Sequence, residues 1–493
     1  MSTEEIIAHF WFAILSVLVY PFVAYAIYKK VKNPHTALML AYLGGLMFLP
    51  ERVMFDLPLL PPMGKQEFAA LMGIIGLRKP LKARFKKRGF LRGPEAIVIL
   101  LAIGCFLTAK TNTDSVIYGF HSEFEIKGME MYDGLSDAIR EFVFIATPFY
   151  LGRIAYQEGD DLRHLMLSLA KAGLIYSLFC WVEFVMSPQL HDWVYNFKQH
   201  EFNQCRRWGG WRPMVFMQHG LAVANFMMMA AVASNTVARA KQRVWGIGGT
   251  LVAWYSNIML VLMKSTGAVM YGLVTIPLTK FARISTLARV IGVLVFLTML
   301  YPISKIGGFF PDKALIQLSS EMVAAERGDS LAFRFRNEAE LVERTRERLW
   351  FGWGGYNRGH IYAGWGQDMT VTDGYWIILL NTRGVWGLGF TFLVLLVPLM
   401  SAARNLRKIK DKKDQLLVAV LGVSVAFLVI DLLPNGLFNN LPYFLTGALW
   451  GLVKTMSDPK YRAQRGGRRI VPLPIPMVPM PPPQTALPVA KTR

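Results

Sequence analysis

Apolar blocks of about 14 to 22 residues recur along the whole chain, for example at 9–28, 165–186 and 416–433. A helix of about 20 apolar residues crosses the hydrocarbon core of a bilayer. A soluble protein of 493 residues would mix polar and apolar residues at helix or strand period, whereas this chain is 53% hydrophobic with a mean hydropathy of +0.34. The pattern predicts an all-α, polytopic helical membrane protein.

The predicted crossings divide the chain into four parts. Residues 1–303 hold the N-terminal membrane helices, 304–372 form one long external loop that contains helices, 373–456 hold the last membrane helices, and 457–493 form a basic, Pro-rich tail. We expect about 12 to 13 membrane helices, some of them short or tilted. They are expected near 9–28, 37–50, 67–77, 94–109, 138–156, 165–186, 216–236, 245–263, 266–279, 286–303, 374–402, 415–433 and 442–456.

The net charge of +21 does not indicate nucleic-acid binding, because the basic residues stand in short clusters between apolar blocks. By the positive-inside rule these clusters are predicted to be cytoplasmic, which places the loops 110–137, 187–215 and 304–372 outside. The tail is then cytoplasmic, as a solvated polyproline II arm that is either disordered or a contact for other assembly proteins. The clusters are 29–32, 78–92, 239–243, 280–283 and 404–413.

The first candidate site lies in the loop before the helix expected at 216–236. It interleaves Arg206, Arg207 and Arg212 with Trp208 and Trp211. Arginine forks suit diphosphate oxygens, and tryptophan faces suit sugar rings. An interfacial belt of Trp and Arg is the structural alternative, but arginines clustered on the outer side go against the positive-inside rule. We therefore favour ligand binding.

A second candidate is a helix predicted at 331–350. Most of its charges form pairs at helical spacing, such as Arg334 with Glu338, which is typical of a solvated helix face. Arg346 falls within the apolar stripe of the helix instead. Arg336 and Arg346 are the two arginines that we retain as functional candidates.

Two further candidates follow in the same loop. The Gly-rich turn at 351–356 contains Trp353 and Tyr356, and its glycines suit either close approach to a ligand or a tight turn. Asp373 precedes a membrane helix, where it is either an N-cap or a general base. No metal motif occurs in the sequence, and we expect no cofactor. Ionisable residues within the membrane are sparse, which weakens an ion-coupled transporter.

Four short motifs follow one another between about residues 200 and 400. They are Arg206-Arg207-Trp208-Gly209-Gly210, Lys264-Ser265-Thr266-Gly267-Ala268, Arg336 with Arg348-Leu349-Trp350-Phe351-Gly352-Trp353-Gly354, and Asp373-Gly374-Tyr375-Trp376 with Arg383-Gly384-Val385-Trp386-Gly387. In order and spacing they resemble the motifs of the O-antigen ligase/polymerase family, which are bacterial, GT-C-like membrane glycosyltransferases. Thr266 stands where that family has Arg, and Asp373 where it has His. The second difference favours a polymerase over a ligase.

The resemblance implies a polyprenyl-diphosphate-linked oligosaccharide as donor and a glycan hydroxyl as acceptor, at the outer leaflet of the bacterial inner membrane. The product would be an exopolysaccharide or O-antigen-type glycan. Asp373 and Arg336 would be catalytic, and the other substrate-binding residues would be Arg206, Arg207, Arg212, Lys264, Arg346, Trp208, Trp211, Trp353 and Tyr356. The alternatives are a ligase acting on a lipid or protein acceptor, a flippase for lipid-linked saccharide, and a scaffold that recruits partners through its tail.

Overall fold

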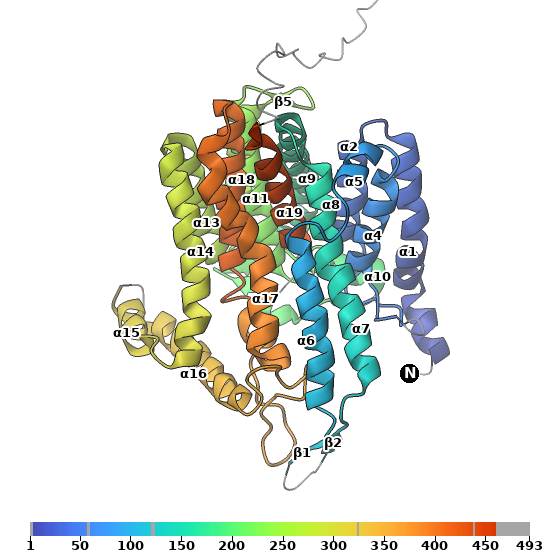
Figure 1. The fold of residues 1–493 in the computed structure, drawn as a ribbon, viewed down its shortest axis with the longest axis vertical. Helices are drawn as coiled ribbons and strands as arrows, with labels where there is room; N and C mark the ends of the chain where they lie inside the picture. The colour runs from blue at the N-terminus through green and yellow to red at the C-terminus, as the bar shows by residue number, and fades with distance from the viewer. Residues whose placement is uncertain (1–2, 57–59, 120–123, 323–324, 437–438, 460–493) are drawn as a thin grey trace, which may run out of the picture.

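The computed structural model describes residues 3–56, 60–119, 124–322, 325–436 and 439–459. Within these ranges the chain is a helical bundle, and its strands form three short antiparallel hairpins. Most helices run side by side, while α15 (Asp312–Met322) and α16 (Ala325–Arg346) project sideways at one end (Figure 1). The predicted all-α, polytopic fold is confirmed.

The helices that precede the long loop are α1 (Thr3–Lys30), α2 (Pro34–Leu38), η1 (Met39–Leu43), α3 (Gly44–Phe48), α4 (Lys65–Leu77), α5 (Lys82–Lys87), η2 (Pro94–Ile97), α6 (Val98–Thr111), α7 (Met131–Glu141), η3 (Phe142–Ala146), α8 (Thr147–Ala155), α9 (Gly159–Met186), α10 (Leu190–Tyr195), η4 (Phe202–Cys205), α11 (Gly220–Arg239), α12 (Gly249–Leu262), α13 (Thr266–Phe281) and α14 (Ile284–Gly307). The later helices are α15 (Asp312–Met322), α16 (Ala325–Arg346), α17 (Tyr375–Asn405), η5 (Leu406–Lys408), α18 (Lys412–Ile430) and α19 (Leu441–Met456). The hairpins pair β1 (Val116–Tyr118) with β2 (Phe124–Ile126), β3 (Arg206–Arg207) with β4 (Gly210–Trp211), and β5 (Arg243–Val244) with β6 (Ile247–Gly248).

By length and composition, seven of the described helices can cross a membrane: α1, α6 with η2, α9, α11, α14, α17 with η5, and α18. The other predicted crossings are shorter or divided helices. The apolar block at 37–50, for example, is divided among α2, the π-helix η1 and α3, and α12 is a shorter apolar helix. The apolar blocks therefore predict where helices occur. Counting each block as a crossing, however, gives about 12 to 13 membrane helices, whereas seven of the described helices are long enough to cross.

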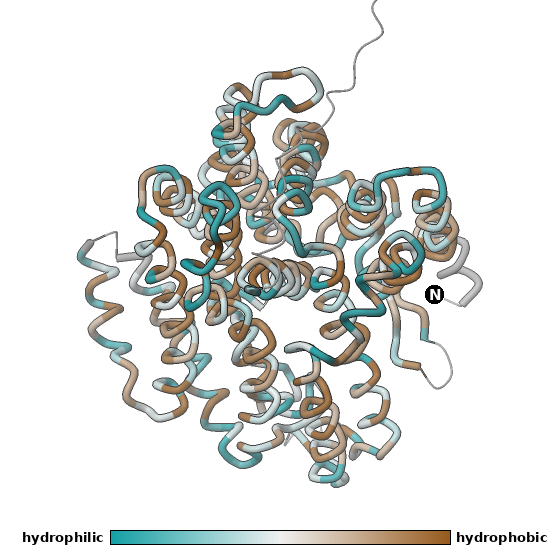
Figure 2. The backbone as a smooth tube through the Cα atoms, turned by 45° about the horizontal axis from the view of Figure 1, so that its top comes forward, coloured by the Kyte–Doolittle hydropathy of each residue, from teal (hydrophilic) through white to brown (hydrophobic). Residues whose placement is uncertain are grey.

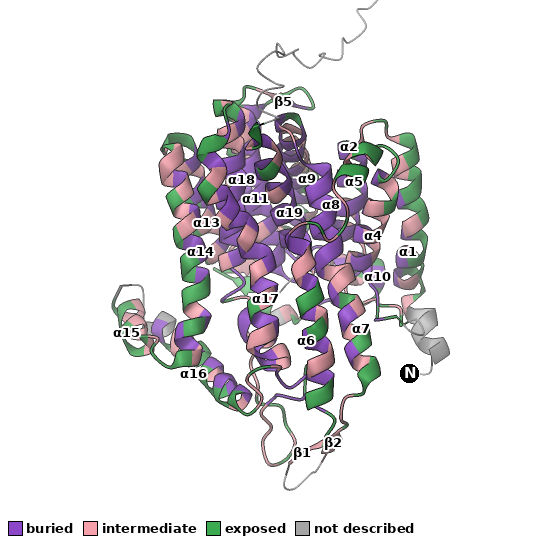
Figure 3. Cartoon of the chain, in the orientation of Figure 1, coloured by how far each residue is buried: buried purple, intermediate pink, exposed green. Residues whose placement is uncertain are grey.

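The bundle has buried central helices and exposed outer ones. The membrane-length segments of α11 and α18 are each 72% buried, whereas those of α1 and α14 are 22% buried. Figure 3 shows this contrast. The outer helices expose large apolar side chains, such as Phe22 on α1 (74%) and Phe296 on α14 (61%). Large apolar side chains exposed along the outer helices suit lipid chains as their surroundings.

Polar connecting segments lie at the two ends of the bundle, and largely hydrophobic helices lie between them (Figure 2). The basic segments near α5 and β5 lie at one end, and β1, β2, α15 and α16 lie at the opposite end (Figure 1). We call the end with β1, β2, α15 and α16 the loop end. This separation agrees with the predicted grouping of basic clusters on one side, and the loop end remains the predicted external side.

Helix α17 is broken at Gly384, whose φ is 62° and ψ is −167°. Loop residues satisfy the opened turn, because the Trp353 N–H donates to the Asn381 carbonyl at 2.8 Å and the Val385 N–H donates to the Leu349 carbonyl at 2.8 Å. Irregular backbone at membrane depth is tolerated where protein groups pair with it. The break therefore fixes the end of the long loop to a membrane helix.

Candidate functional site

The β3–β4 hairpin displays the arginines of the loop before α11. Arg206 faces Trp211 and Arg207 faces Gly210 in antiparallel register. The turn between them, Trp208-Gly209, has φ angles of 49° and 69°, and positive φ at both central positions is the signature of a type I′ hairpin turn. Arg206, Arg207 and Trp208 are exposed. No acidic side chain in the described ranges pairs with either arginine.

Arg212 follows the hairpin and is only 5% exposed. Its guanidinium donates to the Gln204 carbonyl at 3.1 Å and contacts the His219 Nε2 at 3.1 Å. Its Nε is buried and has no hydrogen-bond partner among the described atoms. Burial and the nearby Arg207 lower the pKa of Arg212 to about 10, so the side chain is a cation at neutral pH. A buried cation with an unpaired donor favours an anionic ligand beside it.

His219 caps the first turn of α11, where its Nδ1 accepts the Leu221 N–H at 3.1 Å. Burial and Arg212 lower the pKa of His219 to about 3, so the ring is neutral at pH 7. A neutral cap leaves the charge of Arg212 available and avoids repulsion between two buried cations.

Lys264 lies in the turn between α12 and α13, with a φ of 51°. A Cβ built on Gly210 would lie 2.0 Å from the Lys264 Nζ, so the ammonium rests against the β3–β4 hairpin. Helix α13 begins two residues later, at Thr266. The positive end of its dipole therefore faces the same region as the lysine.

Arg334 of α16 and Asp373, just before α17, form an ion pair of 3.1 Å between Nε and Oδ2. The predicted pairing of Arg334 with Glu338 along the helix is wrong. Glu338 is buried and instead lies 3.3 Å from the Lys305 Nζ, and it accepts from the Trp376 Nε1 at 3.2 Å. Arg334 therefore faces the start of the membrane helix α17, and not solvent alone.

These groups line a single cavity of about 920 Å³, which we call the main cavity. Helices α11, α13 and α17 all begin at it, so three positive dipole ends add to its cationic potential. An excess of positive charge in a cavity of this size suits an anionic, sugar-bearing ligand. Its charged Arg, Lys and Asp side chains are Arg206, Arg207, Arg212, Lys264, Arg334, Asp373 and Asp431.

Asp431 is a site residue that the sequence analysis did not select. It directly follows α18, is 5% exposed and lines the main cavity. The usable signal was an aspartate at the end of an apolar block, where an ionisable residue usually has a function. The residue lies near the end of the helix predicted at 415–433, and only the fold shows that it is buried.

Three other predicted site residues lie away from the main cavity. Arg336 is exposed on α16, two residues from Arg334 and therefore on a different face of the helix. Arg346 pairs with Glu343 at 2.9 Å and donates to the Ile306 carbonyl. Trp211 packs on Phe202 with ring centroids 5.0 Å apart. None of the three lines the main cavity, so the structure does not bring them together with the other predicted site residues, and their roles stay predictions.

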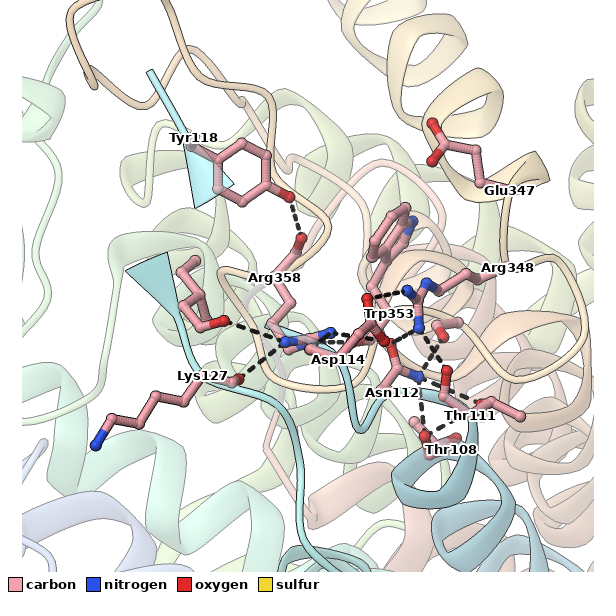
Figure 4. A network of polar contacts seen from close by, with 12 residues as sticks. Thr108, Thr111, Asn112, Asp114, Tyr118, Lys127, Glu347, Arg348, Trp353 and Arg358 are labelled. Atoms are coloured by element: carbon pink, nitrogen blue, oxygen red, sulfur yellow. Dashed lines mark hydrogen bonds and ion pairs between the residues drawn. The ribbon is translucent and has the colours of Figure 1, made fainter. Parts of the chain in front are cut away.

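Trp353 was predicted as a sugar platform, but it is only 3% exposed. Its ring lies against the guanidinium groups of Arg344 and Arg348, whose Cζ atoms lie 3.8 and 4.5 Å from the ring centroid. The neighbouring network shown in Figure 4 ties this turn to the first hairpin and its flanks, for example through Arg348 to Asp114 at 2.6 Å. Trp353 therefore stabilises the loop and offers no free face to a sugar.

Tyr356 and Trp208 are the two predicted sugar platforms that the structure brings to the main cavity. Both line the main cavity, each with a side chain 54% exposed, and the Tyr356 hydroxyl lies 3.0 Å from the Thr372 Oγ1. The Pro-rich tail, predicted to contact partners, lies outside the described residues beyond position 459. Within the described ranges, no cluster of three His, Cys, Asp or Glu side chains is arranged to hold a metal ion.

Comparison with models of known protein families and with curated proteins finds no match for this chain. The main cavity and the motif resemblance are therefore the features that bear on function.

Proposed function

We propose that the chain is a membrane glycosyltransferase that uses a polyprenyl-diphosphate-linked oligosaccharide as donor, at the non-cytoplasmic face of the bacterial inner membrane. One observation supports this most strongly: side chains from the β3–β4 hairpin, the α12–α13 turn and the start of α17 meet in one cationic cavity. Within that cavity Arg212 keeps a buried Nε that has no hydrogen-bond partner in the part of the chain that the structure describes. An anionic diphosphate matches both features.

The proposed reaction joins the glycan to an acceptor hydroxyl. The hydroxyl oxygen attacks the anomeric carbon, the bond from that carbon to the diphosphate oxygen breaks, and the electron pair leaves on the diphosphate. Arg207, Arg212 and Lys264 stabilise the charge that develops there. Trp208 and Tyr356 offer ring faces to the sugars. A carboxylate of the cavity accepts the proton of the hydroxyl, and Asp373 is the carboxylate that the sequence indicates.

Polymerisation is our first choice, because Asp373 replaces the histidine of the related ligases. Ligation to a lipid or protein acceptor is the alternative with the same donor chemistry. A flippase would bind the same carrier but would release no polyprenyl diphosphate.

The deciding experiment supplies the purified, full-length protein in proteoliposomes with polyprenyl-diphosphate oligosaccharide. We expect elongated glycan together with free polyprenyl diphosphate, both measured by chromatography and mass spectrometry. Glycan attached to an added lipid or protein acceptor would identify a ligase instead. Movement of the carrier across the bilayer with no diphosphate release would overturn the proposal in favour of a flippase. If neither transfer nor movement of the carrier is observed, both the transferase and the flippase are overturned.

A further inference from the structure

Asp431 differs from the other carboxylate of the main cavity in what holds it. Its Oδ2 accepts from the Asn225 amide at 2.6 Å and its Oδ1 from the Asn435 amide at 2.8 Å. The Tyr271 hydroxyl is a third hydrogen-bond partner. All three partners are neutral, and no ion pair to Asp431 occurs in the described ranges. Asp373, by contrast, is paired with Arg334.

A buried carboxylate without a cation is costly, so its presence calls for a reason. Asp431 lies beyond the last residue of α18, and burial raises the pKa of its carboxyl. A carboxylate with a raised pKa is a better base at neutral pH than one held by an arginine. The neutral donors orient the two oxygens and still leave lone pairs, because an ionised carboxylate offers about four acceptor positions.

We infer that Asp431 is the general base of the proposed transferase, and that Asp373 positions Arg334. This inference rests on the proposed function. As the acceptor oxygen attacks the anomeric carbon, its proton passes to a carboxylate oxygen of Asp431. The diphosphate leaves with the electron pair of the broken bond, so the protonated Asp431 must return its proton to water before the next turnover.

A second, smaller cavity gives that proton a route away from the diphosphate. It has a volume of about 70 Å³ and shares Asp431 with the main cavity. One buried water needs about 10 to 15 Å³ of such volume, so several waters fit. The Gln218 Nε2 is buried without a partner among the described atoms, and Lys65 and Glu51 form a 2.6 Å ion pair in the same cavity. These polar groups suit a hydrated pocket.

Asp431→Asn tests the assignment, because it keeps the shape and removes the base. With wild-type donor turnover established in the proteoliposome assay, we expect kcat to fall about 100-fold or more. Binding of polyprenyl diphosphate alone should stay within about twofold, since the arginines are untouched. Glu340→Gln, at an exposed position on α16, is the matched control and should keep wild-type kcat. A wild-type kcat in Asp431→Asn would overturn the inference while leaving the transferase intact.

Chemical rescue separates a base from a structural residue. In Asp431→Ala, added formate should restore part of kcat, because a small carboxylate can enter the space that the side chain leaves. A structural defect would not respond to formate, and the absence of rescue in a folded variant would count against the base. Inactive wild-type protein with the same donor would instead overturn the proposed function itself.

Tyr271→Phe keeps the inference testable if the Asp431 variants do not fold. Removing a hydrogen bond to the charged form raises the pKa of the carboxyl, so the acidic limb of the pH–rate profile should move to higher pH. An unmoved limb would overturn the inference. The ionisable neighbours to compare in the same profile are Tyr271, Lys264, His219, Asp373, Glu51 and Lys65, which line the two cavities.

Discussion

The Arg334 Nε lies 3.1 Å from the Asp373 Oδ2, which joins a helix of the long loop to the start of a membrane helix. The two side chains are 43% and 37% exposed, so the pair adds little to stability by itself. The position of the ion pair matters more than its energy, because both residues line the main cavity. The loop helix α16 therefore forms part of the binding site and does not only cover it.

Replacing Arg334 should therefore affect transfer more than folding. For Arg334→Ala we expect the transfer rate to fall about tenfold or more, because a cation that faces the developing negative charge is lost. Arg336→Ala, which removes an exposed arginine two positions away, is the matched control. Transfer from polyprenyl-diphosphate oligosaccharide and thermal unfolding should be measured for both. Equal losses in the two variants would contradict the assignment of Arg334 to the cavity.

Arg212→Lys tests whether geometry or charge matters at the buried cation. The lysine keeps the charge but loses the fork that contacts Gln204 and His219 and leaves Nε available. We expect binding of polyprenyl diphosphate to weaken by about tenfold or more. Titration calorimetry with that ligand measures the effect. Unchanged affinity would show that the anion does not bind at the arginine.

The sequence was sufficient to locate most of the helices and five of the seven charged Arg, Lys and Asp residues that line the main cavity. Apolar length identifies a membrane helix from local residues alone, and Arg207, Arg212, Lys264 and Asp373 were all selected and all line the main cavity. The residue types and their positions near the ends of apolar blocks were enough to select these residues. None of these criteria needs knowledge of which helices are neighbours.

The choice between Arg334 and Arg336 did need that knowledge. Helical spacing assigned Arg334 to Glu338, which seemed to account for its charge. In the fold, Glu338 turns inward to Lys305 and Trp376, and Arg334 finds Asp373 across the loop. Asp431 was missed for a similar reason, since only packing shows that an aspartate at a helix end is buried. Tertiary partners decide the function of such residues, and sequence spacing does not reveal them.

Trp353→Ala should reduce stability and not sugar recognition. The side chain is buried and lies against Arg344 and Arg348, and truncating a buried tryptophan costs about 3 to 5 kcal/mol. Trp350→Ala is the control, because its side chain is 66% exposed and its loss should cost less than about 1 kcal/mol. Thermal or denaturant unfolding in detergent measures both. Loss of activity in a Trp353→Ala protein of unchanged stability would instead support the sugar-platform role.

His219 predicts a pH dependence of stability. Its pKa is about 3 in the folded protein and about 6.5 when unfolded, so the unfolded chain binds the proton first as the pH falls. The contribution of the neutral ring is thus complete above pH 6.5 and is lost progressively below it. Between pH 7 and pH 5 the free energy of unfolding of the wild type should fall by about 2 kcal/mol more than that of His219→Asn. The asparagine keeps an acceptor for the cap but does not titrate.

Denaturant unfolding at several pH values measures this difference. Other groups titrate in both proteins, so only the difference between their curves is assigned to His219. Parallel curves for wild type and His219→Asn would contradict a buried, neutral histidine at the start of α11.

Gly384 gives the sharpest test of the link between the loop and the membrane helices. A Cβ at this position would lie 2.4 Å from the backbone carbonyl atoms of Trp350, and the positive φ disfavours any other residue. Gly384→Ala should therefore destabilise the protein by more than about 3 kcal/mol. Gly389, in the same helix, has nothing within 4 Å of its built Cβ. Gly389→Ala should change stability by less than about 1 kcal/mol.

The same two variants, Gly384→Ala and Gly389→Ala, also test whether the break in α17 holds residues 349–354 in place. If residues 349–354 are held by the opened turn, Gly384→Ala should also increase hydrogen exchange at the Trp353 and Gly354 amides, which donate to α17 carbonyls. Because Arg334 and Tyr356 lie on either side of this segment, donor transfer should fall as the loop loosens. Wild-type exchange at both amides in Gly384→Ala would show that the loop is positioned by other contacts, of which the Arg348–Asp114 ion pair is the first to test.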